Sequence, residues 1–232
     1  NFSTVTESTA RRMRLRMLPG EIGVGASGND DVAGRIGVAD LVQVGYTQFR
    51  NVVFIVLPDS ALSFADGRYN IPAIIGFPVL SRLGRVEFSG DQLRFSPSAA
   101  SGWSESSNLL LRDFEPIVRV EGNGHPLRMF LDSGAGSTNL TPLATRDYAA
   151  LLVGAGSRDV RIGGAGGSRA YEEAATIPRL SIRVGAQAVN LENVDVIGDL
   201  EDGHHGTIGQ DVLRAGGGYA IDFDAMRFEL LP

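Results

Sequence analysis

The stretch around Asp132 constrains the chain most, because an apolar run ends there abruptly in a carboxylate and a turn of small residues. The run Leu127–Leu131 predicts a buried strand, and Asp132 follows at its end. An unpaired buried charge costs several kcal/mol, so a carboxylate at this position must be hydrogen-bonded or used. The Ser133 hydroxyl can lock such a loop, and Gly134 lets backbone N–H groups approach the carboxylate. An ordinary surface Asp-Ser-Gly turn is the alternative.

The residue types that the chain lacks exclude many kinds of chemistry. It contains no cysteine, and all 21 basic residues are arginine. Thiol nucleophiles, disulfides, Cys-based zinc sites, Schiff bases and the P-loop lysine are therefore excluded. With three histidines and no Gly-x-Ser-x-Gly elbow, a Ser-His-Asp hydrolase has little to build from. Carboxylates, hydroxyls and backbone groups remain for chemistry.

The overall composition favours β structure in a chain without a membrane span. Its 232 residues include 30 glycines and 10 prolines, which predict many turns and hence strands. No apolar run approaches the roughly 18 residues of a membrane-spanning helix. A net charge of −6 argues against a nucleic-acid surface.

Several segments recur along the chain at nearly constant offsets. Ile75-Gly76 with Val79-Leu80 matches Ile208-Gly209 with Val212-Leu213, an offset of 133 residues (209 − 76). The other matches are Leu93-Arg94-Phe95 with Met226-Arg227-Phe228 at 133 (228 − 95), Thr6–Arg11 with Thr141–Arg146 at 135 (141 − 6), and Ile22-Gly23 with Ile162-Gly163 at 140 (162 − 22). Such a repeat predicts two related lobes, at residues 1–95 and 109–232, joined by a linker at 96–108.

Two glycine-rich stretches are interpreted as hairpins. The first, Gly23-Val24-Gly25, also satisfies G-x-G-x-x-G together with Gly28. A dinucleotide-binding fingerprint must leave a strand and open a helix, whereas residues 29–37 have no helical apolar stripe. A dinucleotide-binding oxidoreductase therefore stays only as an alternative. The second stretch comprises Ile162, Gly163, Gly164, Ala165, Gly166 and Gly167.

A possible metal site is suggested by His204-His205 beside Glu201-Asp202. Adjacent side chains on an extended loop point apart, so a solvated loop is the favoured interpretation. We expect no metal and no cofactor.

The segment Leu131–Ala135, the second glycine-rich stretch and Thr207-Ile208-Gly209 together resemble the retropepsin-like aspartic proteases. The resemblance implies an all-β, bilobal acid-protease fold of two related β-barrel lobes with short helices. It also implies that Asp132 is catalytic, that Ser133, Gly134 and Ala135 form the active-site loop, and that Ile208-Gly209 lie beside it. Residues 162–167 match the flap that closes over substrate, and Gly23-Val24-Gly25 match a first-lobe flap.

The first lobe departs from the family because it contains no Asp-Ser/Thr-Gly. Counting back by 135 residues from Asp132 gives −3 (132 − 135), just before Asn1. We therefore expect a second aspartate from an upstream segment or, in a homodimer, from a second copy of the second lobe.

The function that the resemblance implies is that of an aspartic endopeptidase acting on a peptide or protein. A catalytically inactive, peptide-binding relative is the alternative. The absence of cysteine is compatible with export, which favours a periplasmic or other exported location over a cytoplasmic one.

Overall fold

The computed structural model describes residues 2–25, 32–64, 68–99, 102–112, 115–164, 167–200 and 203–232. Strands dominate these residues, and the longest helices have six residues, which confirms the expected all-β class. None of the helices described is long and apolar enough to cross a bilayer. The chain divides into two compact units, Asn1–Arg82 with Arg161–Ala170, and Leu83–Val160 with Tyr171–Pro232.

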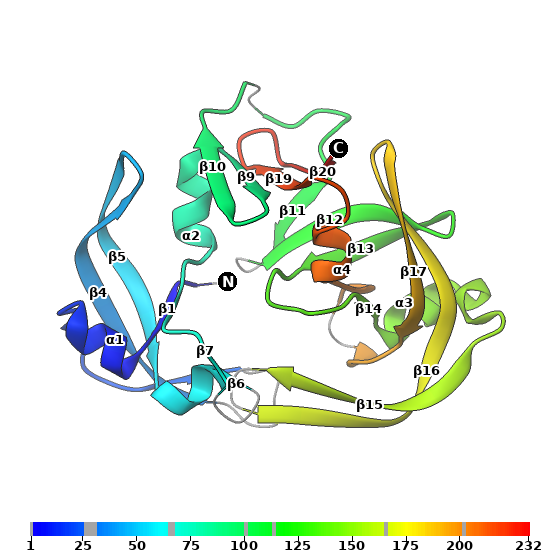
Figure 1. Ribbon diagram of the computed structural model, residues 1–232, viewed down its shortest axis with the longest axis horizontal. Helices are drawn as coiled ribbons and strands as arrows, with labels where there is room; N and C mark the ends of the chain where they lie inside the picture. The colour runs from blue at the N-terminus through cyan, green and yellow to red at the C-terminus, as the bar shows by residue number, and fades with distance from the viewer. Residues whose placement is uncertain are drawn as a thin grey trace. The chain divides into compact units, whose positions relative to one another are not determined.

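The first unit is built on a sheet in the order β2-β4-β5-β1-β8, with β3 paired to β4 (Figure 1). Its elements are β1 (Thr4–Thr6), α1 (Glu7–Arg12), β2 (Arg16–Met17), β3 (Ile22–Val24), β4 (Val32–Val44), β5 (Thr47–Leu57), a 3-10 turn (Asp59–Leu62), β6 (Ser63–Phe64), β7 (Tyr69–Asn70), β8 (Ala73–Ile74) and α2 (Phe77–Leu80). A further 3-10 turn spans Ser81–Leu83. Val5 and Phe54 lie at the centre of the core, at 0% and 1% exposed.

The second unit contains a large sheet in the order β14-β18-β13-β12-β16-β15, with β11 and β17 paired at its side. Parts of β15 and β16, within Arg161–Ala170, belong to the first unit. The elements are β9 (Arg85–Ser89), β10 (Gln92–Ser96), β11 (Leu109–Arg112), β12 (Glu115–Gly122), β13 (His125–Leu131), β14 (Asn139–Leu140), α3 (Pro142–Asp147), a 3-10 turn (Ala149–Leu152), β15 (Gly156–Gly164), β16 (Gly167–Val184), β17 (Gln187–Asp195), β18 (Gly206–Ile208), α4 (Gln210–Leu213), β19 (Gly218–Asp222) and β20 (Arg227–Leu231).

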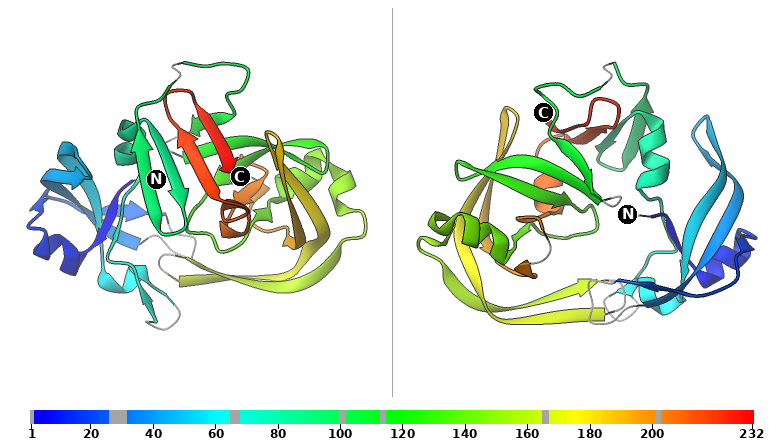
Figure 2. Two further views of the ribbon diagram at one scale, coloured as in Figure 1. Left: turned by 45° about the horizontal axis from the view of Figure 1, so that its top comes forward. Right: turned by 180° about the vertical axis from the view of Figure 1, so that it is seen from behind.

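Strands β9 and β10 belong to the second unit, beside β19 and β20. The four strands form one antiparallel sheet in the order β10-β9-β19-β20 (Figure 2, left). Isolated hairpins are marginal in water, whereas a four-stranded sheet can bury an apolar face. The first compact unit gives way to the second between Arg82 and Leu83. The sequence had predicted this boundary later in the chain, at a linker of residues 96–108.

The hairpin of β12 and β13 positions the segment that begins at Asp132. Asn123 and Gly124 both have positive φ, 48° and 83°, as a two-residue hairpin turn with right-handed strand twist requires. The turn fixes the pairing from Gly122 opposite His125 to Ile117 opposite Phe130. This register buries Leu127, Met129 and Leu131 on one face of β13. The alternation brings the strand to Asp132 with its apolar residues already in the core.

Strand β18 lies between β13, to which it is parallel, and β14, to which it is antiparallel. A Cβ on Gly206 would lie 2.8 Å from Met129 Cε and 2.9 Å from Leu140 Cα. Contacts this short are essentially never made by real Cβ atoms, so the two neighbouring strands leave no room for a side chain at this position.

We predict that Gly206→Ala destabilises the protein by about 1–3 kcal/mol, because overpacking forces these strands apart. Gly156→Ala is the matched control, since nothing lies within 4 Å of its would-be Cβ. Urea unfolding should show a lower midpoint for Gly206→Ala alone. Equal midpoints for the two variants would contradict this packing.

Candidate active site

Asp132 directly follows β13, and both its main chain and its side chain are held. Its N–H donates to the Ile208 carbonyl over 3.1 Å, extending the parallel pairing of β13 with β18. Its Oδ1 accepts the Gly134 N–H over 2.8 Å. A Cβ on Gly134 would lie 3.1 Å from the same oxygen. The structure therefore brings together the carboxylate and the close N–H group that the sequence predicted.

The hydroxyl that locks this loop belongs to Thr138 and not to Ser133. Thr138 is buried, and its Oγ1 accepts the Gly209 N–H over 3.0 Å while donating to Asp211 Oδ1 over 2.6 Å. The Ser133 side chain is exposed and has no hydrogen-bond partner in the described part of the chain. The expectation that Ser133 locks the loop was wrong. The hydroxyl on the buried side of the turn belongs to Thr138, which directly precedes β14.

Asp211 and Gln210, at the start of α4, complete the lock. Asp211 accepts the Thr138 N–H with both oxygens, at 3.0 and 2.9 Å, and also the N–H of Val212. Gln210 donates its main-chain N–H to the Ala135 carbonyl over 2.9 Å and its side-chain amide to the Ser133 carbonyl. Sequence reasoning missed these two residues, although both follow immediately after the Ile208-Gly209 pair that it singled out.

Gly209 allows the loop and the start of α4 to approach each other. A Cβ at this position would lie 2.5 Å from the Ser137 carbonyl carbon and 2.6 Å from its oxygen. Both atoms belong to the backbone, so they cannot move aside as a flexible side chain would. The Asp132 loop is thus fastened to β18 and α4 by backbone contacts that only glycine permits.

His205, immediately before β18, is buried at 2% exposed, so the expectation of a solvated loop was wrong for this residue. Its Nδ1 accepts the Arg128 N–H over 3.0 Å, and its Nε2 lies 3.2 Å from Asp147 Oδ2. Because Nδ1 is an acceptor, the proton of the neutral ring is on Nε2 and is donated to Asp147. Burial lowers the pKa of His205, and the nearby Asp147 carboxylate opposes that shift.

The metal interpretation gains no support from these residues. Within the described ranges, no three His, Cys, Asp or Glu side chains are grouped so that they would hold a metal ion. Glu201 and Asp202 lie outside the described residues.

The two glycine-rich stretches lie in strands at the points where the sequence placed hairpins. Ile162, Gly163 and Gly164 end β15, Gly167 begins β16, and Ala165 and Gly166 lie outside the described residues. Gly23 and Val24 belong to β3, which pairs antiparallel with β4. Gly25 follows β3, and Gly28 is outside the described residues. The next described element is strand β4 and not the helix that a dinucleotide-binding fingerprint opens, so the described residues give that alternative no support.

Part of the chain is similar to a known protein family. Residues 118–212 match the family model described as "Aspartyl protease". The solved structures include a retropepsin-like aspartic protease from Rickettsia conorii with 23% sequence identity and a TM-score of 0.35, over 50% of this chain and 83% of that chain. No curated protein matches the chain. The resemblance predicted from the sequence is confirmed by the family match over a segment that includes Asp132 and Gly209.

We predict that Thr138→Val destabilises the protein by about 1–3 kcal/mol, because it leaves the Gly209 N–H without its acceptor. Thr138→Ser keeps the hydroxyl and should recover most of the loss. Chemical unfolding of the two variants measures the difference. The proposed lock would be refuted by a valine variant as stable as the serine variant.

We also predict that stability falls as the pH is lowered through 6.5, the usual pKa of histidine. The folded-state pKa of His205 lies below that value, so below pH 6.5 the unfolded state binds a proton that the folded state does not. The loss continues until the pH reaches the lowered folded-state pKa. The lowered pKa of Asp147 acts only at more acidic pH, below its usual 3.8.

The measurement is the free energy of unfolding from pH 8 to pH 5. His205→Gln should flatten the pH dependence in this range, and His125→Gln, at a half-buried site, should preserve it. If His205→Gln keeps the full slope, another group causes the pH dependence.

Proposed function

We propose, from the match of residues 118–212 to the aspartyl protease family model, that the chain is an aspartic endopeptidase in which Asp132 is one of two required carboxylates. A water molecule held between the carboxylates attacks the peptide carbonyl. One aspartate accepts the proton of the water, and the other donates a proton toward the developing oxyanion. Two carboxylates about 3 Å apart cannot both ionise, which keeps one of them protonated for this role.

The proposal rests on the Asp132 carboxylate, which is held by a hydrogen bond and has no cation beside it in the described part of the chain. It is only half-buried, and one oxygen accepts the Gly134 N–H. It forms no ion pair with any described residue. A carboxylate that is held in place but not neutralised by a cation is available to a water molecule and to a second carboxylate.

A hydrogen bond in the first unit, equivalent to that between Thr138 and Gly209, supports a second aspartate presented in a similar way. The Ser3 hydroxyl accepts the Gly76 N–H over 2.9 Å, as Thr138 accepts that of Gly209 over 3.0 Å. Ser3 precedes Thr138 by 135 residues (138 − 3), and Gly76 precedes Gly209 by 133 (209 − 76).

The strand pairing agrees with the same offsets. Thr4 and Val5 of β1 lie opposite Ile74 and Ala73 of β8. Asn139 and Leu140 of β14 lie opposite Thr207 and Gly206 of β18 in the same register. The hairpins β4–β5 and β16–β17 turn at Gly45 and Gly185, 140 residues apart (185 − 45), with φ of 57° and 58°. These correspondences support an internal repeat of two related lobes.

The edge of β8 suggests where the second aspartate is carried. In the second unit β18 pairs with β14 on one edge and with β13 on the other. Its counterpart β8 pairs with β1, and no described strand covers its other edge. Ile74 and Ile75 at this edge are 41% and 40% exposed. An apolar strand ending in Asp-Ser/Thr-Gly would pair there as β13 pairs with β18, with the aspartate N–H on the Ile75 carbonyl.

The substrate under this proposal is an extended peptide bound as an added strand. The glycine-rich stretches at 162–167 and at Gly23-Val24-Gly25 act as flaps over it, and apolar side chains of the peptide fill the adjoining pockets. A homodimer in which two copies of Asp132 meet is the other source of the second carboxylate. An exported location, and no interaction with nucleic acid, complete the proposal.

We predict that Asp132→Asn lowers kcat/KM for peptide cleavage by at least about a hundredfold. Asp91→Asn, in the exposed turn between β9 and β10, is the matched control and should leave kcat/KM unchanged. Both changes are tested in this chain and in a form extended upstream in its natural sequence, against a mixed peptide library at acidic and neutral pH.

The outcomes separate the two candidate functions. Cleavage that is lost in Asp132→Asn and blocked by a peptide with a hydroxyl in place of the scissile carbonyl supports the protease. Peptide binding without cleavage by either form favours the inactive peptide-binding protein. Undiminished cleavage by Asp132→Asn would remove Asp132 from the mechanism.

A further inference from the structure

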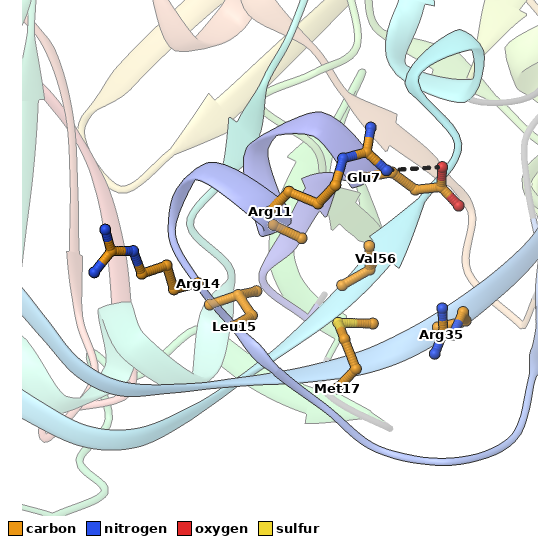
Figure 3. Close-up of a pocket in the computed structure, with 8 residues that line it drawn as sticks. Glu7, Arg11, Arg14, Leu15, Met17, Arg35 and Val56 are labelled. Atoms are coloured by element: carbon orange, nitrogen blue, oxygen red, sulfur yellow. Dashed lines mark ion pairs between the residues drawn. The ribbon is translucent and has the colours of Figure 1, made fainter.

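A cavity of about 260 Å³ lies in the first unit, and its lining includes no residue of the Asp132 loop. Helix α1 and strand β2 form one side of it, and β4 and β5 contribute the other. Its lining residues are Glu7, Ala10, Arg11, Arg14, Leu15, Met17, Arg35 and Val56. Figure 3 shows Arg14 and Arg35 on opposite sides of Leu15 and Met17.

The floor of the cavity is apolar. Ala10, Leu15 and Val56 are 4%, 8% and 3% exposed and belong to the core of the unit, and Met17 packs against them. Thioether and branched aliphatic side chains of this kind accommodate an apolar group of varied shape. The floor can therefore take up a compact hydrophobic body, although the cavity is smaller than the usual pocket for a drug-sized ligand.

The rim of the cavity is strongly basic, in a chain whose net charge is −6. Arg11, Arg14 and Arg35 are exposed, and the lining residues include a single acid, Glu7. Glu7 lies 3.8 Å from Arg11, and an exposed pair of this kind is weak. Neither Arg14 nor Arg35 has an ion-pair partner among the described residues. Within the described part of the chain, the rim thus carries two positive charges without an ion-pair partner, over an apolar floor.

The backbone of Arg14 has a conformation that suits glycine. Its φ is 56°, in the left-handed region that glycine adopts without penalty. It follows the C-cap of α1, where the Leu15 N–H bonds to the Ala10 carbonyl and the Arg14 N–H bonds to the Arg11 carbonyl. Glycine is the usual residue at this position of such a cap. Replacing Arg14 by glycine would therefore remove the guanidinium group without straining the backbone.

We propose that this cavity binds a small carboxylate with an apolar body. The positive charges of Arg14 and Arg35, on either side of the apolar floor, would attract the carboxylate, and the planar N–H fork of an arginine matches its two oxygens. The apolar body would lie on Leu15, Met17 and Val56, where its removal from water favours binding. Two sources share this chemistry: a medium-chain fatty acid, and the terminal carboxylate of a peptide that ends in an apolar residue.

The probes are octanoate and N-acetyl-leucine, titrated into the protein by calorimetry and followed by the NMR signals of Met17. Octylammonium, with an apolar tail and the opposite charge, and acetate, with the charge and no tail, are the matched ligands. We expect at least one of the two probes to bind, and both matched ligands to bind at least tenfold more weakly. Preference for octanoate or for N-acetyl-leucine identifies the source.

Arg14→Gly is the decisive variant, because glycine suits the left-handed backbone. Its thermal midpoint should be equal to or above that of the parent, while its affinity for the probe falls at least tenfold. Arg35→Gln should weaken binding similarly. Arg12→Gln is the control, since Arg12 lies on the same helix, bonds to Thr9 and does not line the cavity. Asp132→Asn should bind the probe normally, so this test is independent of the protease proposal.

Three results would overturn the proposal. The first is no binding of either probe at millimolar concentration. The second is equal binding of octylammonium, which would show that charge plays no part. The third is undiminished binding by Arg14→Gly with its fold intact.

Discussion

The hydrogen bond from the Gly209 N–H to the Thr138 hydroxyl is the contact on which the candidate site depends. It joins the strand that leaves the Asp132 loop to the turn between β18 and α4. Asp211 then accepts both the hydroxyl and the N–H of Thr138, and Gln210 holds two carbonyls of the loop. Because none of these bonds uses the Asp132 carboxylate, the loop is fixed without occupying its oxygen atoms. Preorganisation of this kind is what acid–base chemistry by a single side chain requires.

The same contact occurs in the first unit between Ser3 and Gly76, in strands of identical register. The two units thus share one hydrogen bond and one strand register at corresponding positions of the sequence. They differ after the glycine, where Phe77 and Pro78 stand in place of Gln210 and Asp211. The Ser3 segment consequently lacks the carboxylate that receives the Thr138 hydroxyl in the second unit. The first unit has also acquired the basic, apolar-floored cavity beside α1, which the Asp132 loop does not use.

Local signals in the sequence were sufficient to predict the strand that leads to Asp132 and the close approach of a backbone N–H group that Gly134 permits. Each depends on residues that are close in the chain, and periodicity and turn preferences report such arrangements directly. The all-β class followed from composition and turn signals. The lock between Thr138 and Asp211 could not be predicted, because its partners are 73 residues apart and meet only when β18 enters between β13 and β14. The burial of His205 was missed for a similar reason. The pairing of β9 with β19 could not be predicted either, because these strands are far apart in the sequence and no local pattern indicates their contact.

The most direct test of the central claim is the structure of this protein bound to a peptide in which a secondary alcohol replaces the scissile carbonyl. We expect an extended peptide with its hydroxyl within hydrogen-bond distance of the Asp132 carboxylate. We also expect an unchanged Thr138–Gly209 contact, because the loop is already in its working geometry. A peptide that binds with its hydroxyl away from Asp132, or a loop that must break this contact to admit the peptide, would show that Asp132 does not act as proposed.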